Sequence, residues 1–172
     1  MLTGQIGLRR YSTGWVGKCI EWATNSHTHH VVVAVSETVC ISAEPGGARY
    51  RLISDYPELT WSRFDLTDDQ RTLIRDAAAE MIGRPYNYAI YGPLLWQRIS
   101  GRKVDGWVAE WLARRPNENC SQLVDDIYTM AGLHLFPDIS QLVTPGDFER
   151  LFDPLGWLEP KTLITNRPGR TP

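Results

Sequence analysis

Cys120 is the residue in this sequence that is best placed to act as a nucleophile. It stands in the first turn of a predicted helix, which Asn117 or Asn119 can cap and which Gly132 ends. The unpaired N–H groups and the positive dipole end of a first helical turn favour the thiolate, the nucleophilic form of cysteine. The apolar stripe that defines this helix recurs at three- and four-residue spacing, at Leu123, Val124, Ile127 and Met130.

A nucleophilic cysteine also needs a base, and a histidine cluster lies about ninety residues upstream. His27, His29 and His30 run directly into the β-branched segment 31–35, which is typical of a strand. Paired with Cys120, such a histidine predicts acyl transfer, in which the thiolate attacks a carbonyl carbon and the imidazole donates a proton to the leaving group.

The remaining histidine and cysteine residues have simpler interpretations. His27 and His29 are two residues apart and could bind a metal together with a carboxylate, but a third ligand at a diagnostic spacing is missing, so we expect no metal and no other cofactor. Cys19 lies on the apolar side of a predicted helix and Cys40 lies within a predicted strand. Both are expected to be buried structural thiols.

Composition limits the possible classes of protein. The chain has 172 residues, 42% of them hydrophobic, which suits one domain with a real core. Its net charge is −2 and its basic residues are scattered, so no nucleic-acid partner is expected. No apolar run approaches the roughly twenty residues of a transmembrane helix. No secretory signal is evident, and we expect synthesis in the cytoplasm with the final location open, including a virion.

Several elements are expected to position these residues. Weak alternation over 2–11 predicts a short strand, and the spacing over 15–23 predicts a helix that ends near Asn25. Antiparallel strands are predicted at 30–35, 39–43, 48–53 and 59–66, with turns at 36–38 and 45–47.

The helices that follow are marked by capping signals. Thr67 and Gln70 form a capping-box pattern, and Gly83 ends that helix. Its expected inner face comprises Leu73, Ile74, Ala77, Ala78, Met81 and Ile82. Further helices are predicted at 104–115 and, with proline in the first turn, from Thr144. Asp125 and Asp126 are expected on a solvated face. Residues 1–153 form the predicted domain and 154–172 an extended tail.

The order of these segments is similar to that of the circularly permuted NlpC-type, papain-like cysteine peptidases, in which the histidine strand precedes the cysteine helix. The matching segments are 26–33 (SHTHHVVV), 41–47 (ISAEPGG), 82–88 (IGRPYNY) and 119–124 (NCSQLV), with 144–147 (TPGD) as a weaker fifth. The resemblance covers roughly residues 12–152. It implies an α+β, papain-like fold in which an antiparallel sheet packs against the helix that carries the cysteine.

The resemblance also implies roles for individual residues. Cys120 becomes the nucleophile and His30 the base, which is preferred to His29 because it immediately precedes the apolar run and only one of two successive strand residues can face Cys120. The family often places a glutamate where this chain has Ser42. Glu44 lies two residues on and shares its strand face, so the third member is Glu44, Ser42 or absent. Tyr86 and Ser121 are the residues expected at the substrate or the oxyanion.

The resulting hypothesis is a cysteine hydrolase that cleaves an amide bond, in bacterial cell-wall peptides. Its substrate would be a peptide or other acyl donor, with peptidoglycan as the leading source. Two alternatives use the same fold. One is a thioesterase or acyltransferase that acts on lipid or thioester substrates. The other is a catalytically idle module of a phage tail or secretion assembly, which the replacement of the expected glutamate by Ser42 favours.

Overall fold

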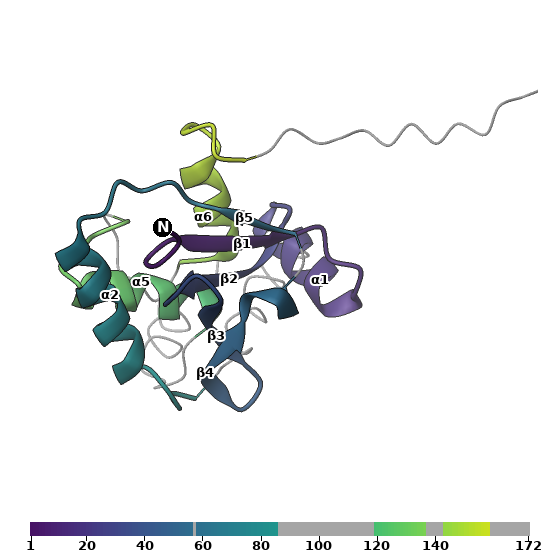
Figure 1. Ribbon diagram of the computed structural model, residues 1–172. Coiled ribbons are helices and arrows are strands. Elements are labelled where there is room, and N and C mark those ends of the chain that lie inside the picture. The colour runs from purple at the N-terminus through teal and green to yellow at the C-terminus, as the bar shows by residue number, and fades with distance from the viewer. Residues whose placement is uncertain (57, 86–118, 137–142, 159–172) are drawn as a thin grey trace, which may run out of the picture.

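The structure of the protein, a computed structural model, describes residues 1–56, 58–85, 119–136 and 143–158 (Figure 1). Tyr86, the predicted helix at 104–115 and most of the predicted tail lie outside the described residues.

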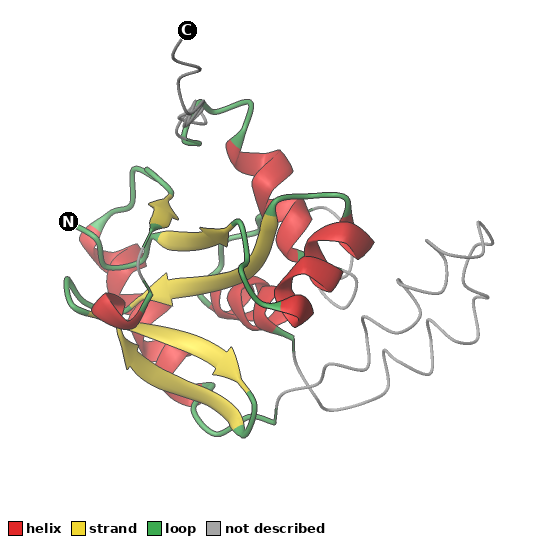
Figure 2. Ribbon diagram, turned by 90° about the vertical axis from the view of Figure 1, so that its right-hand side faces the viewer, coloured by secondary structure: helices red, strands yellow, loops and turns green. Residues whose placement is uncertain are grey.

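Five strands form one antiparallel sheet in the order β4-β3-β2-β1-β5 (Figure 2). The strands are β1 (Ile6–Arg10), β2 (Thr28–Ala34), β3 (Val39–Glu44), β4 (Gly47–Leu52) and β5 (Leu59–Trp61). Together with the helices they confirm the predicted α+β class and the antiparallel meander, while a specifically papain-like identity does not follow from this arrangement.

Strand β5 is shorter than the predicted strand 59–66. Beyond Ser62 the chain no longer pairs with a backbone neighbour. Instead, the side-chain amide of Gln5 donates to the Phe64 carbonyl oxygen at 2.8 Å and accepts from the Phe64 N–H at 2.9 Å. The side chain of Gln5 therefore takes the place of a strand partner and ends the ladder.

The helices begin where the sequence offers caps. They are α1 (Trp15–Thr24), α2 (Asp68–Glu80), α5 (Cys120–Met130) and α6 (Pro145–Phe152), with a short 3-10 turn η1 (Ile53–Asp55). Thr67 and Gln70 form the predicted capping box of α2. Asn119 caps α5, since its Oδ1 accepts the Gln122 N–H at 2.8 Å, and Asn117 lies outside the described residues.

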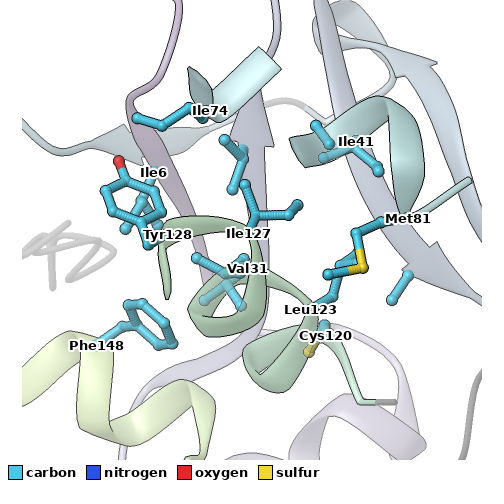
Figure 3. Packing of buried hydrophobic residues seen from close by; sticks show 14 of the residues in the cluster. Ile6, Val31, Ile41, Ile74, Met81, Cys120, Leu123, Ile127, Tyr128 and Phe148 are labelled. Atoms are coloured by element: carbon cyan, nitrogen blue, oxygen red, sulfur yellow. The ribbon is translucent and has the colours of Figure 1, made fainter. Parts of the chain in front are cut away.

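Helix α5 is the centre of the core. It packs against β2, β3, α2 and α6, so apolar side chains surround it on several sides (Figure 3). Among the described residues, the opposite face of the sheet holds a smaller cluster of Val32, Cys40 and Tyr56, against which Ile53, Leu59 and Trp61 pack. No helix among the described residues has the length and apolarity needed to cross a bilayer.

The burial of several residues differs from the sequence prediction. Cys40 is buried as predicted, but Cys19 is exposed. It lies on α1 between Trp15 and Trp22, which are 78% and 47% exposed. Among the described elements, helix α1 makes its larger contacts with β2 and α6. Leu73, Ile82 and Met130, also predicted to face inward, are exposed as well.

Asp125 is the clearest correction, because it is buried and not solvated. The sheet covers one side of α5 and other helices cover further sides, so residues outside the predicted apolar stripe of this helix are buried as well. Burial, together with the neighbouring Asp126 charge, raises the pKa of Asp125 to about 6.

The N-terminal segment ties three parts of the fold together. The Leu2 N–H donates to Glu37 in the β2–β3 turn at 2.7 Å, and the Arg71 side chain from α2 donates to the Thr3 carbonyl oxygen. The Tyr128 hydroxyl from α5 donates to the Gly4 carbonyl oxygen, and the Gly4 N–H donates to Ala34 at the end of β2 at 2.7 Å.

Replacing Asp125 with Asn should stabilise the protein at neutral pH. The pKa of Asp125 is higher in the folded chain than its ordinary value of 3.8, so stability falls as pH rises from about 4 to about 6. We expect Asp125→Asn to raise the free energy of unfolding by about 1–3 kcal/mol at pH 7 and to leave it unchanged at pH 4. Urea unfolding at the two pH values measures this difference, and equal stabilisation at both would contradict the burial of an ionising carboxyl.

Replacing Gly47 with Ala should destabilise the fold through a backbone clash. Gly47 has φ +111°, and an added Cβ would lie 2.8 Å from the Arg84 carbonyl oxygen, whose pairing with the Ala48 N–H at 2.8 Å joins β4 to the end of α2. Gly132 also has a positive φ, of +74°, but open space around it. We expect Gly132→Ala to cost about 1 kcal/mol and Gly47→Ala at least twice as much in chemical unfolding. Equal costs would show that the backbone contact is unimportant.

Candidate active site

A cleft of about 570 Å³ lies at the end of the sheet where β2 begins and β3 ends. Its lining comes from β1, the start of α1, both histidines of β2, the end of β3, and Tyr56 after η1. Charged and hydroxyl-bearing side chains are prominent in it, namely Arg9, Arg10, Glu44, Glu58, Ser12 and Thr13.

His30 is held at this cleft by Ser42. The Nε2 atom of His30 lies 2.8 Å from the Ser42 Oγ, and Ser42 is fully buried on the adjacent strand. The contact follows from the sheet, since β2 and β3 are paired and both side chains lie on the same face as Tyr56.

Tyr56 extends this contact to Glu44. Its hydroxyl oxygen lies 2.9 Å from the Ser42 Oγ and also contacts Glu44 Oε1. The other oxygen of the carboxylate, Oε2, accepts from Arg51 Nε at 2.9 Å and from Arg51 Nη2 at 2.6 Å. Ser42, and not Glu44, therefore forms the hydrogen bond with His30. Glu44 is connected to the imidazole through the hydroxyl groups of Tyr56 and Ser42.

The charges around this network favour a neutral histidine beside an ionised carboxylate. Burial is the main cause that lowers the pKa of His30 to about 4, aided by His29 and Arg9 and opposed by Glu44. Partial burial alone would raise the pKa of Glu44, but hydrogen bonds from Arg51 and Tyr56 bring it below its ordinary value. Burial followed by the Glu44 contact raises the pKa of Tyr56, so its hydroxyl stays protonated.

His29 has a different partner. Its Nδ1 atom lies 3.0 Å from Glu21 Oε1 on α1, and the same oxygen accepts the Ser12 N–H at 2.6 Å. Burial lowers the pKa of His29, with the Glu21 contact acting in the opposite direction. The two histidines therefore line one cleft while being held by separate elements, His29 by α1 and His30 by β3.

Cys120 is fully buried in the first turn of α5, in the same apolar cluster as Val31, Ala43 and Leu123 (Figure 3). The position in the first turn favours the thiolate, whereas complete burial disfavours it. The alternation of β2 puts Val31 and Val33 on the face that α5 covers and His30 on the face of Val32 and Tyr56. The sheet therefore lies between the α5 face and the imidazole along most of β2.

Cys120 is absent from the described lining of this cleft and lies in the apolar cluster on the α5 face. Helix α5 and β2 are joined near Tyr128, whose hydroxyl donates to the Gly4 carbonyl oxygen, while the Gly4 N–H donates to Ala34 at the end of β2. Cys120 lies eight residues before Tyr128, about 12 Å along a helix. Ala43 from the α5 side and His30 from the other side both line the cleft.

Ser121, expected at the oxyanion, is fully buried, and its hydroxyl has no hydrogen-bond partner among the described residues. A metal site at His27 and His29 gains no further ligand in the described part of the chain, where groups of three or more metal-binding side chains are lacking. Sequence reasoning missed Tyr56 and Glu21, which are single polar residues without a motif around them.

Comparisons with known proteins give a similarity in structure. No family model matches the chain, and no curated protein sequence matches it. A solved structure that it resembles is described as metalloprotein yiiX from Escherichia coli O157:H7, DUF1105. The two share 18% identity with a TM-score of 0.54, over 77% of this chain and 68% of that chain. At this identity the similarity shows a shared fold and nothing more.

These findings contradict the predicted membership of the circularly permuted NlpC-type family. The similar structure is described as a metalloprotein and not as an NlpC-type, papain-like peptidase. The prediction was wrong because each of its motifs is short and recurs in many proteins, so their order in one chain did not establish common descent.

The low pKa of His30 can be checked by nuclear magnetic resonance. We expect the ring protons of His30 to titrate with a midpoint near pH 4 in the folded protein and to return toward 6.5 in urea, because burial removes the solvation of the imidazolium. Since the unfolded chain then binds more protons between pH 4 and 6.5, this group makes the fold more stable as pH rises through that window. A folded-state midpoint between 6 and 7 would contradict the burial of the ring.

Proposed function

We propose that this protein is a cysteine hydrolase that cleaves an amide bond, with Cys120 as the nucleophile and His30 as the general base. The observation that supports it most directly is the cleft at the start of β2. This cleft holds a neutral imidazole that is fixed by Ser42, and the strand that carries the imidazole also packs against the cysteine helix.

In this proposal the resting pair is an uncharged thiol and an uncharged imidazole. His30 takes the thiol proton as Cys120 attacks the carbonyl carbon, and it then gives that proton to the departing amine. The backbone N–H groups in the first turn of α5 and the Ser121 hydroxyl, which has no partner among the described residues, would receive the oxyanion. Water then hydrolyses the acyl-enzyme and restores the thiol.

The lining of the cleft favours a peptide over a lipid as the acyl donor. Arg9 and Glu58 line it and have no ion-pair partner among the described residues, and hydroxyl groups of Ser12 and Thr13 lie nearby. Such a surface suits the charged and amide groups of a peptide, including cell-wall peptides.

Covalent trapping tests the assignment. A peptidyl probe with a thiol-directed electrophile should label the parent protein at Cys120, fail to label Cys120→Ala, and label His30→Ala about 100- to 10,000-fold more slowly. His29→Ala is the matched control, because it removes the neighbouring cleft histidine while leaving the Ser42 contact in place.

Each outcome has a distinct meaning. Loss of labelling in His29→Ala with retention in His30→Ala would transfer the role of base to the His29–Glu21 pair. Labelling that is equal in the parent and both histidine variants would contradict a cysteine–histidine mechanism. Turnover of muropeptides but not of long-chain acyl esters by the parent would support the peptide substrate, and the reverse would overturn it.

A further inference from the structure

The described network around His30 contains a residue that sequence reasoning did not assign. Tyr56 stands between Ser42 and Glu44, and all three side chains belong to one face of the sheet. Ser42 is fully buried, and Tyr56 is 7% exposed although it also lines the cleft. The Ser42 hydroxyl therefore has to find its hydrogen-bond partners within the network.

The direction of each hydrogen bond follows from counting donors. Arg51 donates twice to Glu44 Oε2, and the ionised carboxylate can only accept, so the Tyr56 hydroxyl donates its single hydrogen to Oε1. The geometry of the 2.9 Å contact allows Tyr56 to donate to Ser42, but with its one hydrogen on Oε1 this contact is a hydrogen bond only when Ser42 donates to the Tyr56 oxygen. Ser42 has no second hydrogen, so it must accept from His30 Nε2 across the 2.8 Å contact.

We propose that Tyr56 is a positioning residue: it connects Glu44, which can only accept hydrogen bonds, to Ser42 and through Ser42 to His30. This series of hydrogen bonds, the relay, holds the imidazole as the tautomer with its hydrogen on Nε2. The chain of donation runs from His30 to Ser42, to Tyr56 and to Glu44. It leaves the lone pair on Nδ1, the nitrogen that the proposed function needs to accept the thiol proton. The catalytic meaning of the relay rests on that proposed function, but the tautomer itself does not.

The relay makes a specific prediction for Glu44→Gln. Arg51 still requires an acceptor, so the amide oxygen of Gln takes the place of Oε2 and its NH₂ group faces Tyr56. Tyr56 must then accept, its hydrogen turns to Ser42, and the hydrogen of Ser42 turns to His30 Nε2. The whole chain reverses, and the imidazole carries its hydrogen on Nδ1.

Nitrogen-15 spectroscopy of the histidine rings distinguishes the two tautomers at pH 7. We expect pyrrole-type Nε2 and pyridine-type Nδ1 signals for His30 in the parent protein, and the exchanged pattern in Glu44→Gln. Tyr56→Phe should shift the tautomer ratio in the same direction by about tenfold or more, since the buried hydrogen of Ser42 then has only His30 as its acceptor. Glu58→Gln, which alters another carboxylate of the cleft outside the network, should leave the signals unchanged.

The spectra and the labelling assay separate the two proposals. An Nδ1–H tautomer in the parent, or an unchanged tautomer in both Glu44→Gln and Tyr56→Phe, overturns the relay whatever the activity. An exchanged tautomer with labelling of Cys120 slowed about 10- to 100-fold at unchanged probe affinity supports it. An Nε2–H tautomer in the parent that Glu44→Gln exchanges, in a protein whose parent form no probe labels, supports the relay and counts only against the proposed hydrolase.

Discussion

The alternation of side chains along β2 is the constraint on which the rest of the structure depends. Val31 and Val33 face α5 and build the main core, while His30 and Val32 face the opposite side. One strand therefore supplies both the packing surface for the cysteine helix and the first member of a buried polar network. A shift of its register by one residue would exchange these two roles and bury the imidazole among apolar side chains.

Burial of polar groups is tolerated around His30 because each group finds a partner. Ser42, Tyr56 and Glu44 form a continuous series of contacts that ends at the half-exposed Arg51. A half-satisfied series would be more costly than an apolar replacement. The neutral hydroxyl groups also keep the negative charge of Glu44 two side chains away from the imidazole, which agrees with a histidine that stays uncharged at neutral pH.

Much of the frame was predictable from sequence, since strand alternation, the Thr67–Gln70 capping box and the cap of α5 are local signals. Exposure was less predictable: Cys19 lies on a helix that contacts few of the described elements, and Asp125 lies on one covered from several sides. The contacts of His30 were only partly foreseen. The contact of His30 with Ser42 could be predicted from the pairing of neighbouring strands. Tyr56 follows the short turn after β4, and no local sequence pattern predicts that its side chain contacts Ser42.

The N-terminal segment holds separate parts of the fold together. Residues 2–4 join the β2–β3 turn, α2 and α5, three elements that are far apart along the chain. The position of α5 along β2 is thus fixed partly by the hydrogen bond between Tyr128 and Gly4, which lies about 12 Å along the helix from Cys120. Proteolytic cleavage after Gly4 would leave all the cleft-lining residues in one polypeptide, but it would allow α5 to shift along β2. Resistance of this segment to proteases would therefore report on the integrity of the cleft.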